Sequence, residues 1–368
     1  MLNERVVKTF IDLASISSPS KQENKVRDYI VNKLNHYGLN VIEDDTANEI
    51  NGTSGNLICK IQGKQDLSIL FDAHMDTVDP CEKITVIQKD HYLYSDGTSV
   101  LGADDKAGIA AMLELIESIM ELDEYTGPNL IFIFSVCEEN SLQGVKNLNA
   151  KYLENVDYAF VLDGEEQVEF VVNKTPYGCK GDLIIVGKEA HSGVCPENGI
   201  NALYVAAQAI VQCPNGRVDF ETTCNMGVVA GGKAKNVVMP EVKIEFESRS
   251  LNKQKLENLV EQIQSTFSQV AKQYGADFIH TLKYGTPGYT LESNEPICMY
   301  LGKAMEQCGM HMQLVSCGGG SNANIYHMNN IPALNIGVGA NHVHTKQESL
   351  DILELLKLVQ LVRKLSNI

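Results

Sequence analysis

The sequence contains no apolar run long enough to cross a membrane and no closely paired cysteines. A bilayer-spanning helix needs roughly 18 consecutive apolar residues, and no stretch of this chain approaches that length. The 10 cysteines are scattered, without a C-x-x-C pair. We therefore expect reduced thiols in a cytoplasmic protein rather than a zinc finger or a disulfide framework. The charged, amphipathic N-terminal segment is not expected to be a signal peptide.

Basic residues are also scarce. The chain has 30 lysines and arginines against 47 aspartates and glutamates, which gives a formal net charge of −17. Nucleic acids and anionic membrane surfaces attract basic proteins, so neither is expected as a partner. The length of 368 residues, with 44% hydrophobic and 21% charged residues, is typical of a globular protein of two domains.

The order of apolar and amphipathic segments predicts an α/β fold interrupted by an α+β insertion. Short continuous apolar runs alternate with helical segments such as 106–121, as in a parallel sheet buried on both faces. In the middle of the chain the order becomes β-α-β-β-α-β, the ferredoxin-like arrangement. The α/β alternation then resumes and ends in a helix predicted over 348–365. We predict one discontinuous domain at 1–175 and 284–368, and an inserted domain at 176–283.

Acidic residues and histidines recur where the predicted strands end. The carboxyl ends of parallel strands are where open α/β sheets bind ligands. One such acidic residue would ordinarily begin a turn or cap a helix. Ligand-type side chains in five separate segments instead favour a metal site. The segments SILFDAHMD, LGADDKAG, IFIFSVCEEN, AFVLDGEE and LNIGVGANHVHT supply His74, Asp76, Asp104, Asp105, Glu138, Glu139, Asp163, His342 and His344.

This set of side chains suits zinc, which binds neutral imidazole nitrogen and carboxylate oxygen. Two histidines with at least three carboxylates exceed the needs of one tetrahedral ion, and they suffice for two ions that share a bridging carboxylate. Such a pair of ions polarises a carbonyl group and activates water. Co²⁺ or Mn²⁺ could occupy the same ligands.

The ordered motifs AHMDT, GADDKAG, CEEN, LDGEE and HVHTKQE resemble those of the co-catalytic di-zinc exopeptidase family. This family includes peptidase T, the carboxypeptidase G type, and deacylases such as acetylornithine deacetylase. The similarity covers nearly the whole chain, and GADDKAG and EENSLQG most resemble the peptidase T-like branch. The resemblance implies a zinc-exopeptidase-like α/β catalytic domain with an inserted ferredoxin-like lid and dimerisation domain. It also implies two Zn²⁺ per subunit, a short-peptide substrate and a homodimer.

The resemblance further implies a ligand set. His74 and Asp163 would bind one zinc ion, Glu139 and His344 would bind the other, and Asp104 would bridge the two. His344 is preferred to the nearby His342 because HTKQE matches the family spacing.

Catalytic roles follow from the same motifs. Glu138 would be the general base that takes a proton from the water between the two zinc ions and passes it to the departing amine. Asp76 would hydrogen-bond His74 and fix its tautomer. Asp105 would be structural, and the family often has a cis peptide bond between Asp104 and Asp105.

Three residues of the inserted domain are candidates for contact with the substrate. The resemblance implies that His191 donates to the substrate carbonyl, often from the partner subunit, whereas Arg249 and Asn236 bind the carboxylate end and the backbone of the peptide. From the residues alone, His191 could equally be a structural histidine in a turn, and Arg249 could form a salt bridge on an edge strand. The glycine-rich segment CGGGSNAN lacks a nucleotide-binding spacing and is expected to line the substrate pocket.

The leading functional hypothesis is an aminopeptidase that releases N-terminal residues from tripeptides. A carboxypeptidase or an N-acyl-amino-acid amidohydrolase would use the same metals and base. A catalytically inactive metal-binding dimer is the alternative outside the enzymes. Glu138 beside the ligand Glu139 favours an enzyme, because a structural metal site needs no spare base.

Overall fold

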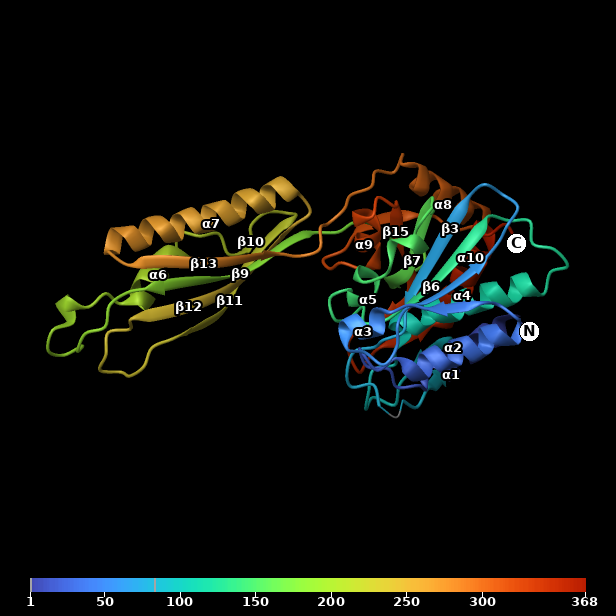
Figure 1. The fold of residues 1–368 in the computed structure, drawn as a ribbon, viewed down its shortest axis with the longest axis horizontal. Helices are drawn as coiled ribbons and strands as arrows, with labels where there is room; N and C mark the ends of the chain where they lie inside the picture. The colour runs from blue at the N-terminus through green and yellow to red at the C-terminus, as the bar shows by residue number, and fades with distance from the viewer. Residues whose placement is uncertain (1, 83) are drawn as a thin grey trace. The chain divides into compact units, whose positions relative to one another are not determined.

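The computed structural model describes residues 2–82 and 84–368, and the chain folds into two compact units (Figure 1). Unit 1 comprises Met1–Asn173 and Leu291–Ile368, and unit 2 comprises Lys174–Thr290. The insertion predicted at 176–283 ends earlier than unit 2, because the segment after the last strand of the insertion pairs back at a β-bridge between Lys174 and Thr290. No helix in the described part of the chain is long and apolar enough to span a bilayer.

Unit 1 is organised around a mixed sheet that has 11 strands among the described residues, in the order β1-β2-β6-β3-β7-β15-β16-β5-β4, with β8 beside β15 and β14 beside β8. The central strands β6, β3, β7 and β15 are parallel, as predicted, whereas the shorter strands at both edges pair antiparallel. The strands are β1 (Val41–Glu43), β2 (Leu57–Ile61), β3 (Ser68–His74), β4 (Ile87–Lys89), β5 (Tyr92–Tyr94), β6 (Asn129–Ser135), β7 (Tyr158–Glu165), β8 (Phe170–Lys174), β14 (Gln313–Ser316), β15 (Ala333–Asn341) and β16 (Ser349–Asp351).

Helices cover both faces of the central strands. Successive residues of a strand point to opposite faces. In β3, Ala73 faces Gly108 of α4, whereas Asp72 accepts a hydrogen bond from Tyr326 of α9 at 2.8 Å. A Cβ atom at Gly108 would overlap the Leu162 carbonyl of β7, so glycine allows α4 to approach the sheet closely. The helices of unit 1 are α1 (Leu2–Ala14), α2 (Asn24–His36), α3 (Thr46–Ile50), α4 (Ala103–Met120), α5 (Gln143–Lys146), α8 (Pro296–Gln307), α9 (Asn322–Met328) and α10 (Ile352–Leu365).

Two helix starts differ in how well the sequence predicts them. In α4, Asp104 and Asp105 have non-helical dihedral angles and are joined by a cis peptide bond, so the regular helix begins where it was predicted. The predicted start of the final helix at 348 is wrong. Residues Ser349–Asp351 form β16 instead, and α10 begins at Ile352 after Asp351, whose carboxylate accepts the Leu353 N–H at 2.8 Å. A side-chain cap of this kind sets a helix start more firmly than the apolar period does.

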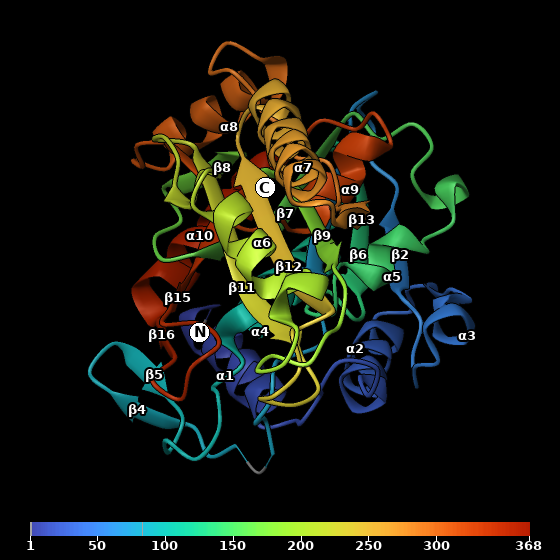
Figure 2. The same cartoon turned by 90° about the vertical axis from the view of Figure 1, so that its left-hand side faces the viewer.

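Unit 2 is an antiparallel sheet with two helices on one face (Figure 2). Its strand order β10-β11-β12-β9-β13 is the ferredoxin-like order with the short strand β10 added at one edge. Apolar residues of α6, α7 and the sheet form a separate core that includes Phe246, Ile263 and Phe267. The elements are β9 (Tyr177–Val186), α6 (Ala202–Ile210), β10 (Gly216–Arg217), β11 (Thr222–Gly231), β12 (Glu241–Ser250), α7 (Lys253–Tyr274) and β13 (Asp277–Tyr284).

Candidate metal centre

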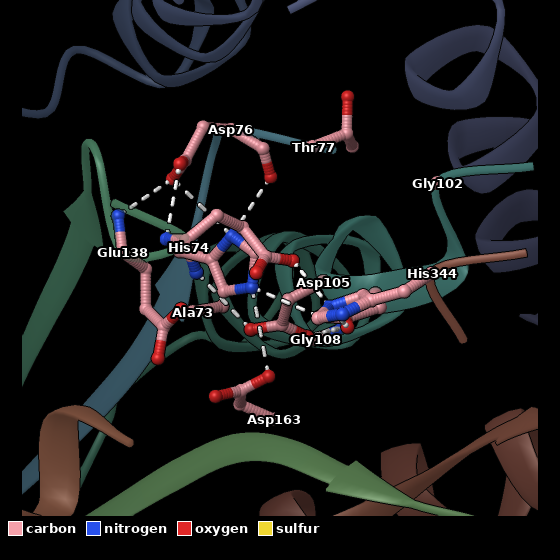
Figure 3. Close-up of polar contacts among 12 residues, drawn as sticks. Ala73, His74, Asp76, Thr77, Gly102, Asp105, Gly108, Glu138, Asp163 and His344 are labelled. Carbon is pink, nitrogen blue, oxygen red and sulfur yellow. Dashed lines mark hydrogen bonds and ion pairs between the residues drawn. The ribbon is translucent and has the colours of Figure 1, made fainter. Parts of the chain in front are cut away.

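The predicted ligand residues of unit 1 lie together at the carboxyl ends of the central strands (Figure 3). Strands β3, β6, β7 and β15 are parallel, so their carboxyl ends meet there. His74 is the last residue of β3, Asp163 lies in β7, and Glu139 follows β6. Asp104 lies at the start of α4, and His344 lies in the loop after β15.

Asp104 lies between the two histidines. Its Oδ1 atom is 2.9 Å from Nε2 of His74, and its Oδ2 atom is 3.2 Å from Nε2 of His344. On one side, Oδ1 of Asp163 is 3.5 Å from Nε2 of His74. On the other, Oε1 of Glu139 is 2.8 Å from Nε2 of His344. Asp104 therefore lies between a histidine–carboxylate pair on each side, as a carboxylate that bridges two cations would.

Asp105 has a different place from its neighbour Asp104. His74, Asp105 and Asp163 offer ligand atoms within 4.8 Å of one another, as do His74, Asp104 and Glu139. Both oxygens of Asp105 are already occupied, however. Oδ2 accepts the backbone N–H of His74 and Oδ1 accepts a backbone N–H of α4, each at 3.1 Å. Asp105 thus anchors the end of β3 to α4, which agrees with the structural role expected for it.

The imidazole of His74 is oriented by Asp76. Nδ1 of His74 is 2.8 Å from the backbone oxygen of Asp76 and 3.4 Å from its Oδ1 atom. With its Nδ1 atom placed against this carbonyl, the imidazole presents Nε2 to Asp104 and Asp163. The shorter contact comes from the main chain, whereas the sequence suggested the carboxylate.

The carboxylate of Asp76 holds the segment that follows β6. Oδ1 accepts the N–H of Glu138 at 2.9 Å, and Oδ2 accepts the N–H of Glu139 at 3.2 Å. Ser20 donates to Oδ2 from the segment between α1 and α2 at 2.6 Å. Sequence reasoning missed Ser20, because a hydroxyl that acts through a second side chain leaves no pattern of its own.

Glu348 is a second residue whose place the sequence did not define. It closes the HTKQE motif, and its side chain is buried. Its carboxylate accepts the N–H groups of Gly102 at 2.8 Å and Asp104 at 3.1 Å. The loop that carries His344 is thereby tied to the start of α4. The spacing between His344 and Glu348 was the available signal. His342, the alternative ligand, makes none of the contacts described above for His344.

The acidic cluster attracts protons. Burial and the neighbouring carboxylates raise the pKa of Asp163 to about 7. Hydrogen bonds to Asp104 and Glu139 raise the pKa of His344 to about 11. Burial alone would lower the pKa of His74, but its hydrogen bonds to Asp104 and Asp163 hold that pKa well above the usual value. A divalent cation would replace these protons and offset the same negative charge, so the donor set fits the expected metal.

Glu138 differs from the ligand-type residues around it. Its side chain is buried, and among the described residues none hydrogen-bonds to its carboxyl group. Burial, followed by the charge of Asp163, raises the pKa of Glu138 well above its usual value. A carboxyl group beside a candidate metal site, with no hydrogen-bond partner among the described residues and a raised pKa, is suited to accept and return a proton.

The three candidate residues of unit 2 lie in two places. His191 and Asn236 are exposed on paired loops, where the N–H after His191 donates to the Asn236 carbonyl at 3.0 Å. Arg249 lies near the end of β12, and its guanidinium is 3.0 Å from Glu247. The strand begins at Glu241, so Arg249 is separated from the two loops by roughly 27 Å at about 3.4 Å per residue. A tripeptide is only about 10 Å long and cannot span that distance within one unit 2.

Two family models match different parts of the chain, one within unit 2 and one mainly within unit 1. A family model described as the peptidase dimerisation domain matches residues 177–275, and one described as peptidase family M28 matches residues 56–180. The uncharacterised protein YqjE of Bacillus subtilis is 37% identical over 364 residues, which cover 98% of each chain.

Two solved structures are similar over almost their full length. The aminopeptidase PepT of Bacillus cereus is 36% identical, with a TM-score of 0.93 over 99% of this chain and 98% of that one. A tripeptidase of Staphylococcus aureus is 32% identical, with a TM-score of 0.92 over 99% and 97%. The fold, with its acidic strand-end cluster and inserted dimerisation domain, defines a metallopeptidase that hydrolyses peptide bonds. Within this class, the chain belongs to the peptidase T-like branch of the M20 family, as its motifs predicted.

The proton load of the cluster predicts how metal binding depends on pH. Metal binding requires neutral imidazoles and ionised carboxylates. Because His344 and Asp163 have raised pKa values, a divalent metal ion must displace protons, and its apparent affinity should rise with pH. We expect an increase of up to about tenfold per pH unit for each proton released between about pH 6 and 8. Calorimetry of the metal-stripped protein, in buffers of different ionisation enthalpy, measures both quantities. A pH-independent affinity without proton release would contradict this account.

Proposed function

We propose that this protein is an aminopeptidase that releases the N-terminal residue of tripeptides and uses two zinc ions per subunit. The observation that carries the proposal is the Asp104 carboxylate, which presents one oxygen to His74 and the other to His344. The similarity to an aminopeptidase and a tripeptidase, each at more than 30% identity, supports the substrate class. All 10 cysteines are free, which agrees with a reducing, cytoplasmic environment.

In this proposal five residues hold the metal ions. His74 and Asp163 bind one ion, Glu139 and His344 bind the other, and Asp104 bridges them. Bound zinc supplies a Lewis acid that polarises the scissile carbonyl and makes water more acidic, and Co²⁺ or Mn²⁺ would be substitutes. Asp76 keeps His74 in the tautomer that directs Nε2 to the metal.

Glu138 is the general base of the proposed reaction. Its carboxylate takes a proton from the attacking water, holds it as the carbon–nitrogen bond breaks, and delivers it to the nitrogen of the departing amine. The raised pKa of Glu138 suits both transfers, because a group that stays strongly acidic would not retain the proton. The absence of a hydrogen-bond partner among the described residues leaves the carboxylate available for water.

We further propose a homodimer in which two subunits contribute to one substrate site. His191 would donate a hydrogen bond to the carbonyl oxygen as negative charge develops on it, and Asn236 would bind the peptide backbone. Arg249 would bind the terminal carboxylate by two parallel hydrogen bonds. The separation of Arg249 from His191 and Asn236 along β12 supports different subunits as their source. The match of unit 2 to a dimerisation domain supports the same assembly.

Blocked peptides test the aminopeptidase proposal. With the zinc-loaded protein, we expect rapid release of the N-terminal residue from a free tripeptide and no cleavage of its N-acetylated form. The C-amidated form should be cleaved with a raised KM, because it lacks the carboxylate that Arg249 would bind. Chromatography of the products identifies the bond that is broken. Preferential cleavage of the N-acetylated peptide would instead identify an acyl-amino-acid hydrolase, and release of the C-terminal residue would identify a carboxypeptidase.

Two adjacent glutamates separate catalysis from metal binding. Glu138→Gln should retain both metal ions and KM but lower kcat by about 10²–10⁴-fold, the usual contribution of general acid–base catalysis. Glu139→Gln is the matched variant and should lose metal, because it removes a ligand. Metal content and kinetics are measured on the same preparations. Undiminished hydrolysis by metal-loaded Glu138→Gln would remove Glu138 from the mechanism.

Mixed dimers test the origin of His191. His191→Ala and Glu138→Gln homodimers should both be nearly inactive. A dimer with one subunit of each kind has one intact site if His191 acts across subunits. An equimolar, fully exchanged mixture should then recover about a quarter of the wild-type activity, because half of the dimers are mixed and each has one working site. Differently tagged subunits verify the exchange. No recovery despite exchange would show that His191 does not act across the dimer.

A further inference from the structure

The turn that carries Glu138 and Glu139 is held by side chains from elsewhere in unit 1. Four consecutive backbone N–H groups donate to side-chain oxygens, and none of these oxygens belongs to the turn. The donors and acceptors are Val136 N to Asn56 Oδ1 at 3.1 Å, Cys137 N to Glu23 Oε1 at 3.0 Å, Glu138 N to Asp76 Oδ1 at 2.9 Å, and Glu139 N to Asp76 Oδ2 at 3.2 Å.

Cys137 is the residue where this turn most needs support. Its φ angle is +53°, in the left-handed region that side chains other than glycine rarely adopt. The side chain of Cys137 is buried, so solvent does not satisfy the local main chain. The direction in which Glu138 leaves the main chain depends on this conformation. The hydrogen bond to Glu23 acts on the N–H group of Cys137 itself.

Glu23 supports two left-handed residues of the main chain, Cys137 and Lys21 (φ +74°). It directly precedes α2, but its side chain does not cap that helix. The residue is 0% exposed, and Oε1 also accepts the N–H of Lys21 at 2.8 Å. Oε2 has no hydrogen-bond partner among the described residues. A buried carboxyl group with one unsatisfied oxygen is costly, and its hydrogen bonds to the main chain offset that cost only in part.

Residues near Glu23 in the chain contact the segment that follows His74. Ser20 from the same segment donates to Asp76 at 2.6 Å, and the N–H of Thr77 donates to the carbonyl of Ser18 at 2.9 Å. Burial, followed by the charge of Asp76, raises the pKa of Glu23 to about 7. The neutral form of Glu23 is therefore substantially populated at neutral pH, and in that form Oε1 still accepts hydrogen bonds.

We propose that Glu23 is a positioning residue for the proton transfer. It holds Cys137 in its left-handed conformation and thereby directs the side chain of Glu138. This inference rests on the proposed function of Glu138 as the base. The segment between α1 and α2 is thus part of the active site, although none of its residues is a candidate ligand. The necessary property of Glu23 is an acceptor oxygen at one point, and its negative charge is not required.

Three substitutions of Glu23 test this role. Glu23→Gln keeps the acceptor oxygen and resembles the neutral form, so kcat should stay within about threefold of wild type. Glu23→Ala removes the acceptor and should lower kcat by about 10²-fold with unchanged KM and metal content, since a displacement of about 1 Å has an effect of that size. Glu23→Asp keeps the carboxylate, but its shorter side chain moves the acceptor oxygen away from the N–H of Cys137, so this variant should also have a lower kcat. Asp serves as the informative variant if Ala does not fold.

A double variant distinguishes positioning from general destabilisation. If Glu23 acts through Glu138, then Glu23→Ala combined with Glu138→Gln should have the same kcat as Glu138→Gln alone. The control is Glu354→Ala, which removes another buried carboxyl group that accepts a backbone N–H, that of Val168 at 2.9 Å. This variant should lower the thermal stability and leave kcat unchanged.

Each contrary result has a distinct meaning. Wild-type kcat in Glu23→Ala or Glu23→Asp would overturn the inference, and so would an equal further loss of kcat in the double variant. Full activity of Glu138→Gln would overturn the proposed base itself. An inactive Glu138→Gln together with a fully active Glu23→Ala would leave the base in place and remove only Glu23.

Discussion

The carboxylate of Asp104, shared between His74 and His344, is the interaction around which the rest of unit 1 is arranged. One oxygen of Asp104 contacts each histidine, so a shift of this residue would disturb both halves of the proposed metal centre. Two buried acids restrain it. Glu348 accepts the N–H of Asp104. Asp105, the next residue in the chain, accepts the N–H of His74 at the end of β3. The charge of the centre is thus positioned by main-chain hydrogen bonds rather than by the ligands alone.

Asp76 links the proposed metal ligands to the proposed base. Its backbone oxygen orients His74, and its carboxylate holds the N–H groups of Glu138 and Glu139. One residue therefore sets the geometry of a ligand on β3 and of the turn after β6. Glu23 extends this arrangement to the segment before α2. A hydrolase of this kind needs a base that lies beside the metal without binding it, and the two oxygens of Asp76 hold Glu138 and Glu139 at different points.

The sequence predicted the parts of this account that depend on residue type and period. Apolar runs identified the central strands, and the acidic and histidine residues at their ends identified the cluster. The inserted ferredoxin-like order was readable because β9 to β13 follow one another with clear periods. The start of α10 could not be predicted from the apolar pattern, because the Asp351 cap determines where this helix begins. Ser20 and Glu23 were also missed, since both act on backbone or second side chains that only the fold brings near.

We claim that two metal ions share Asp104, and the metal content of the chain is the decisive measurement. The metal content per chain is measured by elemental analysis after zinc loading and removal of unbound metal, in the wild type and in His74→Ala and His344→Ala. If each histidine serves a different ion, the wild type should hold about two ions and each variant about one. A wild type that holds a single ion, or histidine variants that both keep two, would contradict the claim.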